Sequence, residues 1–174
     1  MEFILEFNDV LSEEMCENII KKYDKDERKI KGDLMITSLP DWNDIDKHVS
    51  DVLSKYIDIY IDTIDKYCVE KSYTTFELLH DTGLKIQKDD YYKWREDSYY
   101  SNVDRKLSCI FYLNTLQVND GGSTIFSCGK QIRPKCGSLL IFPSTWTYYH
   151  RGEEIYNREK YTITTFIVSD SVCV

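Results

Sequence analysis

Hydrophobic residues first recur at helical spacing directly after a short apolar segment at Phe3–Phe7, which we expect to be a strand. Ser12 suits the N-cap of a helix because its hydroxyl can accept a backbone N–H bond, and Glu13 and Glu14 favour the positive end of the helix dipole. The apolar positions that follow are Met15, Ile19, Ile20 and Tyr23. They predict a helix of about three turns that ends in the polar run Asp24–Lys29.

A second, longer helix is predicted after the segment bracketed by Gly32 and Pro40, with Asp41 or Asn43 as its cap. Its apolar residues keep a helical period, while Asp and Lys fill the opposite side. The apolar positions are Ile45, Val49, Val52, Leu53, Tyr56, Tyr60, Ile64 and Tyr67. We expect both helices to brace one sheet and to expose their charged sides to solvent.

From Tyr73 onward the apolar residues alternate with polar ones or form short continuous runs, as in β-strands. The predicted strands are Thr74–Leu79, Leu84–Lys88, Tyr91–Trp94, Leu107–Asn114, Gly122–Phe126, Lys130–Pro134, Ser138–Phe142, Thr145–His150 and Tyr161–Val168. Helices followed by strands are typical of an α+β domain.

Composition narrows the function classes. A chain of 174 residues is long enough for one domain with a sizeable core. Its formal net charge of −8 is repelled by phosphate backbones, so we expect no nucleic-acid partner. Six cysteines without a Cys-X-X-Cys pair indicate free thiols rather than a disulfide framework or a zinc site. The chain has neither a signal-peptide pattern nor an apolar run of membrane-spanning length, so we expect a soluble, cytoplasmic protein with no membrane partner.

Six short motifs follow one another in the C-terminal half. They are Asp97, Tyr112-Leu113-Asn114, Gly121-Gly122-Ser123-Thr124-Ile125-Phe126, Pro134-Lys135-Cys136-Gly137 through Phe142-Pro143, His150-Arg151-Gly152, and Lys160. In this order and spacing they resemble the Fe(II)/2-oxoglutarate dioxygenases, especially the prolyl 4-hydroxylase branch with its stand-alone viral and bacterial members. Each motif is weak alone, but the ordered set is specific.

The resemblance implies a fold and a site. The fold is a double-stranded β-helix, or jelly roll, in which residues 1–70 provide mainly helical support and residues 71–174 form the core of a single domain. The strand pattern alone does not distinguish this fold from another sandwich or barrel. The family's cofactors are Fe(II) and 2-oxoglutarate. By resemblance, Asp97 and His150 are metal ligands, Lys160 anchors the far carboxylate of 2-oxoglutarate, and Tyr112 and Thr162 belong to the cofactor pocket. Asp97, His150 and Lys160 form the expected catalytic set.

Arg95 departs from the family pattern, which has His at this position of its His-X-Asp motif. A guanidinium has no free lone pair for a metal and stays charged. Residues i and i+2 of a strand share a face, so we expect Arg95 to form an ion pair with Asp97 and to put positive charge where iron would lie. Glu96 points to the opposite face unless a bulge turns it. His48 and His80 lie at no family ligand position.

Each candidate also has an ordinary structural explanation. His150 can end a strand without binding anything, Lys160 can protect a strand edge, and Asp97 can begin a turn with Ser98. The pair Gly121-Gly122 fits a hairpin turn in either case. Aromatic residues here can form core or a substrate surface: Tyr91, Tyr92 and Trp94 favour core, whereas Trp146, Tyr148 and Tyr149 suit both.

Two hypotheses follow. The first is a working Fe(II)/2-oxoglutarate dioxygenase that hydroxylates a protein, peptide or small molecule, which the retained Asp97, His150 and Lys160 favour. The second is a pseudo-oxygenase with the same fold, inactive because of Arg95 and kept as a binding or interaction module. The loops at Tyr99–Arg105 and Leu116–Asp120 are where we expect selectivity. Substrate identity and oligomeric state stay open.

Overall fold

The computed structural model describes residues 3–65, 79–81, 83–88, 93–100 and 103–169. The helices are α1 (Glu13–Lys25) and α2 (Asn43–Asp65), with short 3-10 helices η1 (Pro40–Trp42), η2 (Val118–Asp120) and η3 (Trp146–Tyr148). The strands are β1 (Leu5–Phe7), β2 (Asp33–Met35), β3 (Leu79–Asp81), β4 (Lys85–Lys88), β5 (Tyr99–Tyr100), β6 (Val103–Tyr112), β7 (Thr124–Phe126), β8 (Gln131–Ile132), β9 (Ser138–Pro143), β10 (His150–Gly152) and β11 (Tyr161–Ser169). The predicted α+β composition is therefore confirmed.

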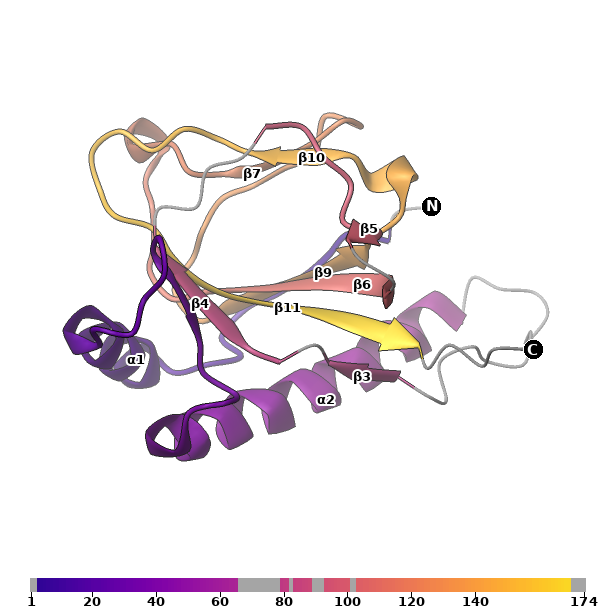
Figure 1. Ribbon diagram of the computed structural model, residues 1–174. Coiled ribbons are helices and arrows are strands. Elements are labelled where there is room, and N and C mark those ends of the chain that lie inside the picture. Colours follow the sequence, from indigo (N-terminus) through magenta and orange to yellow (C-terminus); the bar gives the residue numbers. More distant parts are fainter. Residues whose placement is uncertain (1–2, 66–78, 82, 89–92, 101–102, 170–174) are drawn as a thin grey trace.

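Two antiparallel sheets face each other. Within the described residues, the larger sheet has the order β1-β9-β6-β11-β4-β2, with β3 also paired to β11 and β5 to β6. The smaller sheet has the order β10-β7-β8. Figure 1 shows the smaller sheet above the larger one and both helices against the larger sheet's outer face. The space between the sheets is where the predicted site residues meet.

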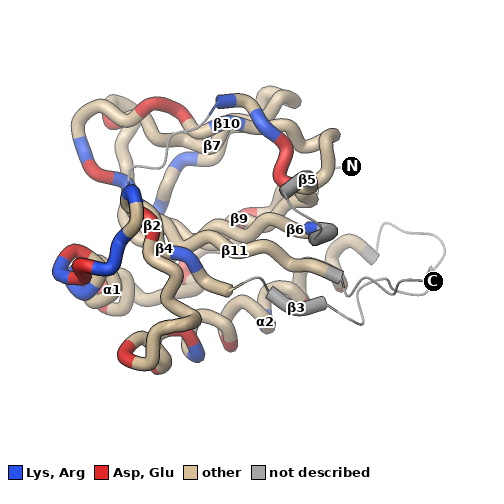
Figure 2. Tube along the Cα trace, in the orientation of Figure 1, with Lys and Arg blue, Asp and Glu red and all other residues tan. Residues whose placement is uncertain are grey.

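The first helix forms where its sequence signals lie. The Ser12 side chain accepts a hydrogen bond from the Met15 N–H at 3.2 Å, and the two glutamates occupy the first turn as predicted. Cys16, Ile19 and Tyr23 are buried against the sheet. The opposite side carries interleaved acidic and basic residues, as Figure 2 shows for α1 and the loop after it. No helix in the described part of the chain is long and apolar enough to cross a membrane.

The central strands β6 and β11 divide the interior because their side chains alternate between two faces. One face joins the main core beneath the helices, with Leu107, Cys109, Phe111, Tyr161, Ile163 and Ile167. The other face turns toward the smaller sheet. Ile110 and Tyr112 join a second core there with Phe126 and Phe142, while Ser108, Thr162 and Thr164 line a pocket. The strand register therefore decides which hydroxyls reach the site.

Several predicted strands need correction. The predicted strand Thr145–His150 is wrong, because residues 146–148 form η3 and β10 begins at His150. The chain crosses from one sheet to the other here, and the Tyr148 N–H donates to the Thr145 carbonyl at 2.9 Å. The predictions at Phe3–Phe7, Gly122–Phe126 and Lys130–Pro134 were too long, since only β1, β7 and β8 form there.

Two further predictions lie partly outside the described residues. Of Thr74–Leu79, the structure describes Leu79, which begins β3. Of Tyr91–Trp94, it describes Lys93 and Trp94, which are not in a strand. His48 is exposed on α2, on the outer side of the larger sheet, and His80 lies in β3.

Candidate functional site

Backbone pairing brings Arg95 and His150 together. The Arg95 N–H donates to the His150 carbonyl at 2.8 Å, and the His150 N–H donates back at 2.9 Å. Two residues further on, the Asp97 N–H donates to the Ser144 carbonyl at 3.2 Å, just beyond β9. The segment 95–97 is thus held against two other segments although it is an isolated bridge rather than a regular strand.

Asp97 lies at the centre of a buried polar network. Its carboxylate is 6% exposed and accepts a hydrogen bond from Ser108 Oγ at 2.8 Å. Ser108 Oγ is in turn 2.8 Å from Ser144 Oγ. Burial acts to raise the pKa of Asp97, but the neighbouring His150 imidazole, the charge of Arg95 and the Ser108 hydrogen bond together lower it. Asp97 is therefore a carboxylate at neutral pH.

His150 faces the same carboxylate from β10. Its Nε2 lies 3.4 Å from Asp97 Oδ2, and the side chain is only 1% exposed. Nδ1 lies 2.9 Å from the Tyr148 carbonyl, which can only accept, so Nδ1 carries a hydrogen and Nε2 is the atom turned to Asp97. Phe126 and Phe142 pack around the ring at centroid distances of 5.6 and 4.8 Å. These aromatic contacts fix its orientation.

Arg95 makes the ion pair expected from its position. Its Nε lies 3.3 Å from Asp97 Oδ1, while its side chain is 45% exposed. Asp97 thus has a basic side chain near each of its oxygens: His150 near one and Arg95 near the other.

Lys160 approaches from another side of the pocket. The residue immediately precedes β11 and is 4% exposed, and its Nζ lies 5.7 Å from the ring centroid of Tyr112. The Tyr112 and Thr124 hydroxyls lie 2.7 Å apart. Thr162, also 4% exposed, follows on β11. Gly122 lies beside the lysine stem and leaves room for Leu116, because a Cβ there would lie 2.5 Å from Leu116 Cδ1 and at an ordinary contact distance of 3.5 Å from Lys160 Cδ.

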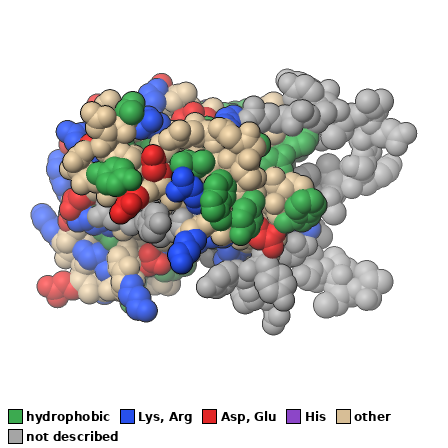
Figure 3. Space-filling model, turned by 90° about the horizontal axis from the view of Figure 1, so that it is seen from above, with side chains coloured by type: hydrophobic (Ala, Val, Ile, Leu, Met, Phe, Trp, Pro, Cys, Tyr) green, Lys and Arg blue, Asp and Glu red, His purple; other side chains and the backbone are tan. Residues whose placement is uncertain are grey.

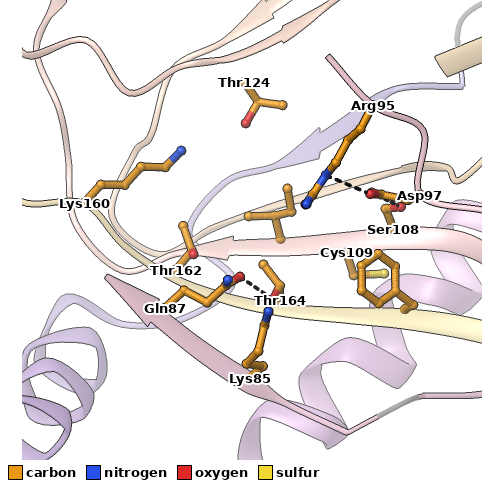
Figure 4. A pocket seen from close by; sticks show the side chains of 12 residues that line it. Lys85, Gln87, Arg95, Asp97, Ser108, Cys109, Thr124, Lys160, Thr162 and Thr164 are labelled. Carbon is orange, nitrogen blue, oxygen red and sulfur yellow. Dashed lines mark hydrogen bonds and ion pairs between the residues drawn. The ribbon is translucent and has the colours of Figure 1, made fainter. Parts of the chain in front are cut away.

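The pocket between the sheets is shown in Figure 4, where Arg95 and Lys160 reach into it from different sides. Its empty volume, including space open to solvent, is about 470 Å³. Its floor includes Lys85 and Gln87, both bound to Asp33 at 3.1 Å, and the Thr164 hydroxyl donates to Gln87 Oε1 at 2.8 Å. This pocket is lined by four of the predicted residues, Asp97, Arg95, Lys160 and Thr162. The other two are not among its lining residues but contact residues that are: His150 lies beside Asp97, and Tyr112 lies beside Thr124.

Sequence reasoning missed the polar residues Ser108, Ser144 and Gln87 that support the site, and it named Thr124 only as part of the motif that begins at Gly121. The available signal was Ser108, a serine within the mainly apolar segment Leu107–Leu113. Its partners lie on other strands, and a pattern along one segment does not give cross-strand register.

An exposed aromatic pair lies beside the paired segments. The rings of Trp94 and Tyr149 stack at 6.0 Å with an angle of 3°, and the Arg151 guanidinium lies 5.5 Å from the Trp94 ring centroid. Trp94 is 42% and Tyr149 41% exposed, and Trp146 nearby is 75% exposed. Figure 3 looks at the molecule from above and shows hydrophobic side chains gathered beside Lys and Arg.

Comparison with known proteins gives the family. The model of the 2OG-Fe(II) oxygenase superfamily matches residues 82–168, which is half of the chain. The protein therefore belongs to this superfamily, as its ordered motifs predicted. No curated protein matches the sequence.

Solved prolyl hydroxylases share the fold. The viral collagen prolyl hydroxylase of Paramecium Bursaria Chlorella virus-1, in complex with 2OG, matches over 97% of each chain with a TM-score of 0.72 and 16% identity. A Pseudomonas putida prolyl-4-hydroxylase matches over 98% of this chain and 95% of its own with a TM-score of 0.66 and 13% identity. The Trichoplax adhaerens prolyl hydroxylase, in complex with a hypoxia inducible factor peptide fragment, matches over 97% and 84% with a TM-score of 0.65 and 15% identity. The predicted jelly roll is therefore confirmed.

The side chains in the described part of the chain do not fit the iron that the superfamily implies. Asp97 and His150 supply two donors, and the third position holds a guanidinium 3.3 Å from the carboxylate. Among the described residues, no group of three or more His, Cys, Asp or Glu side chains is arranged to hold a metal ion. For 2-oxoglutarate the pocket fits better, because a buried lysine and several hydroxyls face the same space.

Proposed function

We propose that the protein binds 2-oxoglutarate in the pocket between its sheets and acts as a binding or interaction module without iron-dependent hydroxylation. The observation that carries this proposal is the ion pair between Arg95 and Asp97 at 3.3 Å. A metal ion would have to displace this pair, and among the described residues it would gain only Asp97 and His150 as ligands.

Lys160 is the residue that would hold a carboxylate of 2-oxoglutarate. Its ammonium group is buried at 4% exposure, where a charge-assisted hydrogen bond is stronger than it is in water. The Thr162 and Thr124 hydroxyls line the same space and can donate to the ligand's oxygens. Bound 2-oxoglutarate would supply a charged group that bridges the two sheets.

A peptide or protein is the partner that the surface favours. The exposed Trp94–Tyr149 stack and Arg151 lie directly beside the residues that pair Arg95 with His150. Stacked aromatic rings with a neighbouring arginine are typical of protein-recognition surfaces. The Trichoplax adhaerens neighbour was solved in complex with a peptide fragment, which supports the same kind of partner.

The second candidate is hydroxylation of a protein, peptide or small molecule. It is favoured by the convergence of Asp97 and His150, whose side-chain atoms lie 3.4 Å apart at 6% and 1% exposure. For this function Fe(II) would supply the oxygen chemistry, and Asp97 and His150 would be its ligands. Arg95 would have to leave its present position.

Titration of wild type and Arg95→His with Fe(II) distinguishes the metal-free binding module from the iron-dependent hydroxylase. We expect weak Fe(II) binding and no succinate from 2-oxoglutarate in wild type. Arg95→His supplies a third donor and removes the competing cation. Loss of even an outer partner of a metal ligand costs about 10–100-fold in metal affinity, so a new direct ligand should raise Fe(II) affinity by at least about tenfold.

Arg95→Ala is the matched control, because it removes the guanidinium without adding a donor. If the lone pair matters, Arg95→Ala should bind Fe(II) less tightly than Arg95→His. Wild type that binds Fe(II) as tightly as Arg95→His and releases succinate at the same rate would contradict the proposed function and establish the second candidate.

A further inference from the structure

The charge of the pocket points to a ligand with two anionic groups. Its lining contains three basic side chains, Lys85, Arg95 and Lys160, and one acidic side chain, Asp97. Lys85 is bound to Asp33 at the floor, so Arg95 and Lys160 are the cations that reach into the space from different sides. One carboxylate at Lys160 would leave the positive charge of Arg95 facing the ligand's other end.

Arg95 is suited to accept that second anionic group. Its ion pair with Asp97 uses Nε, and a guanidinium has five N–H donors in a planar fork. The side chain is 45% exposed and lines the pocket, whereas its backbone is fixed by two hydrogen bonds to His150. The backbone therefore stays in place while the guanidinium adjusts to a ligand.

We infer that this protein binds short dicarboxylates without metal, with Lys160 holding one carboxylate and Arg95 the other. The inference rests on the proposed function and extends it. Arg95 would hold the second carboxylate through its charge and its N–H donors, and neither interaction requires a 2-oxo group beside that carboxylate. The ligand class therefore includes saturated dicarboxylates of the same length.

Calorimetry on the metal-free protein, with a chelator present, tests this selectivity. The ligands are 2-oxoglutarate, glutarate, which lacks the oxo group, and pentanoate, which lacks the second carboxylate. Glutarate should bind within about tenfold of 2-oxoglutarate, because one neutral hydrogen bond corresponds to no larger factor. Pentanoate should bind about 10–150-fold more weakly, since it loses a charge-assisted contact.

Variants at each end of the pocket locate the two contacts. Lys160→Met and Arg95→Gln should each weaken both dicarboxylates by about 10–150-fold, and Arg95→Lys, which keeps the charge without the fork, should weaken them less. Arg158→Gln, at an exposed position before Lys160, makes the same charge change outside the pocket and should leave binding unchanged. Circular dichroism verifies that each variant is folded.

The outcomes separate the inference from the proposed function. Metal-free binding of 2-oxoglutarate with glutarate more than about 100-fold weaker, and with Arg95→Gln unchanged, would overturn the inference and leave the proposed function standing. Binding of 2-oxoglutarate only when Fe(II) is added, or no binding under either condition, would overturn both. Arg95→His gives a further check: it should lose metal-free glutarate binding and gain Fe(II)-dependent preference for 2-oxoglutarate.

Discussion

Gly121 offers the sharpest structural test, because it occupies a conformation and a space that suit only glycine. Its φ is +72° and its ψ −147°, and it ends η2 just before β7. A Cβ built at this position would lie 2.0 Å from the Glu154 carbonyl oxygen and 3.1 Å from the Tyr156 ring. The Glu154 carbonyl is backbone and accepts a hydrogen bond from the Gly122 N–H, so it cannot move aside alone.

Two terms set the expected loss for Gly121→Ala. A backbone with φ of +72° and ψ of −147° lies outside the left-handed α region and close to one that essentially only glycine populates, so it costs an L-residue roughly 1–3 kcal/mol, and forcing atoms into packed space costs roughly 1–3 kcal/mol more. The free energy of unfolding should therefore fall by about 2–6 kcal/mol, or about 4–24 °C in Tm for a chain of this size.

Gly129→Ala is the matched control for the backbone term. Gly129 has a φ of +90°, but a Cβ there would meet nothing within 4 Å. Gly129→Ala should lower the free energy of unfolding only by the strain of the positive φ, roughly 1–3 kcal/mol. Urea denaturation of both variants measures the difference. If Gly121→Ala loses no more stability than Gly129→Ala, the close approach of Gly121 to Glu154 is not a real constraint.

The substitution Gly121→Ala should also disturb the pocket between the sheets. Gly121 and Gly122 lead directly into Thr124, and Gly122 packs beside the Lys160 stem. Gly121→Ala should therefore also weaken 2-oxoglutarate binding, whereas Gly129→Ala should not.

Two further predictions concern titratable groups elsewhere in the fold. Hydrogen bonds from Arg28 and Trp42 lower the pKa of Asp26 below its ordinary 3.8, so its stabilising effect is present at neutral pH and is lost on protonation. The difference in free energy of unfolding between wild type and Asp26→Asn should be constant above about pH 5 and should shrink below about pH 4. Urea denaturation measures this difference, and a value that stays constant below about pH 4 would refute the prediction. Burial raises the pKa of the Cys16 thiol to about 12, while Cys128 is exposed. At about pH 8, iodoacetamide should modify Cys128 well before Cys16, as mapped by mass spectrometry, and equal rates would refute this.

The sequence predicted the elements that depend on local signals. The capped first helix, the long second helix and the central strand β11 formed where period and capping residues indicated, whereas β6 at Val103–Tyr112 overlaps the predicted strand Leu107–Asn114 but begins and ends earlier. The predicted strand at Thr145–His150 failed although its residues favour β-structure, because the chain must turn there to cross between sheets. At this point the path of the chain between the two sheets overrides the β-propensity of the individual residues.

For the candidate site, the sequence predicted what lies within one segment. The pairing of Arg95 with Asp97 followed from their i and i+2 spacing, and the ion pair is present at 3.3 Å. The contacts of Asp97 with Ser108 and of Ser108 with Ser144 depend on how three separate segments align, and spacing along the chain does not contain that information. The roles of Asp97, His150 and Lys160 toward metal and cofactor remain predictions for the binding experiments.

The retention of Asp97 and His150 has a structural explanation that does not require catalysis. Asp97 is a buried carboxylate, and removing one partner of a buried charge is strongly destabilising because the remaining charge is left uncompensated. His150, Arg95 and Ser108 surround it from three different segments of the chain. Arg95 compensates the charge of this carboxylate, and the network ties those segments together. Because stability alone would explain the presence of Asp97 and His150, these two residues give weak support for hydroxylation. The identity of residue 95 is the feature that distinguishes a hydroxylase from a metal-free binding module.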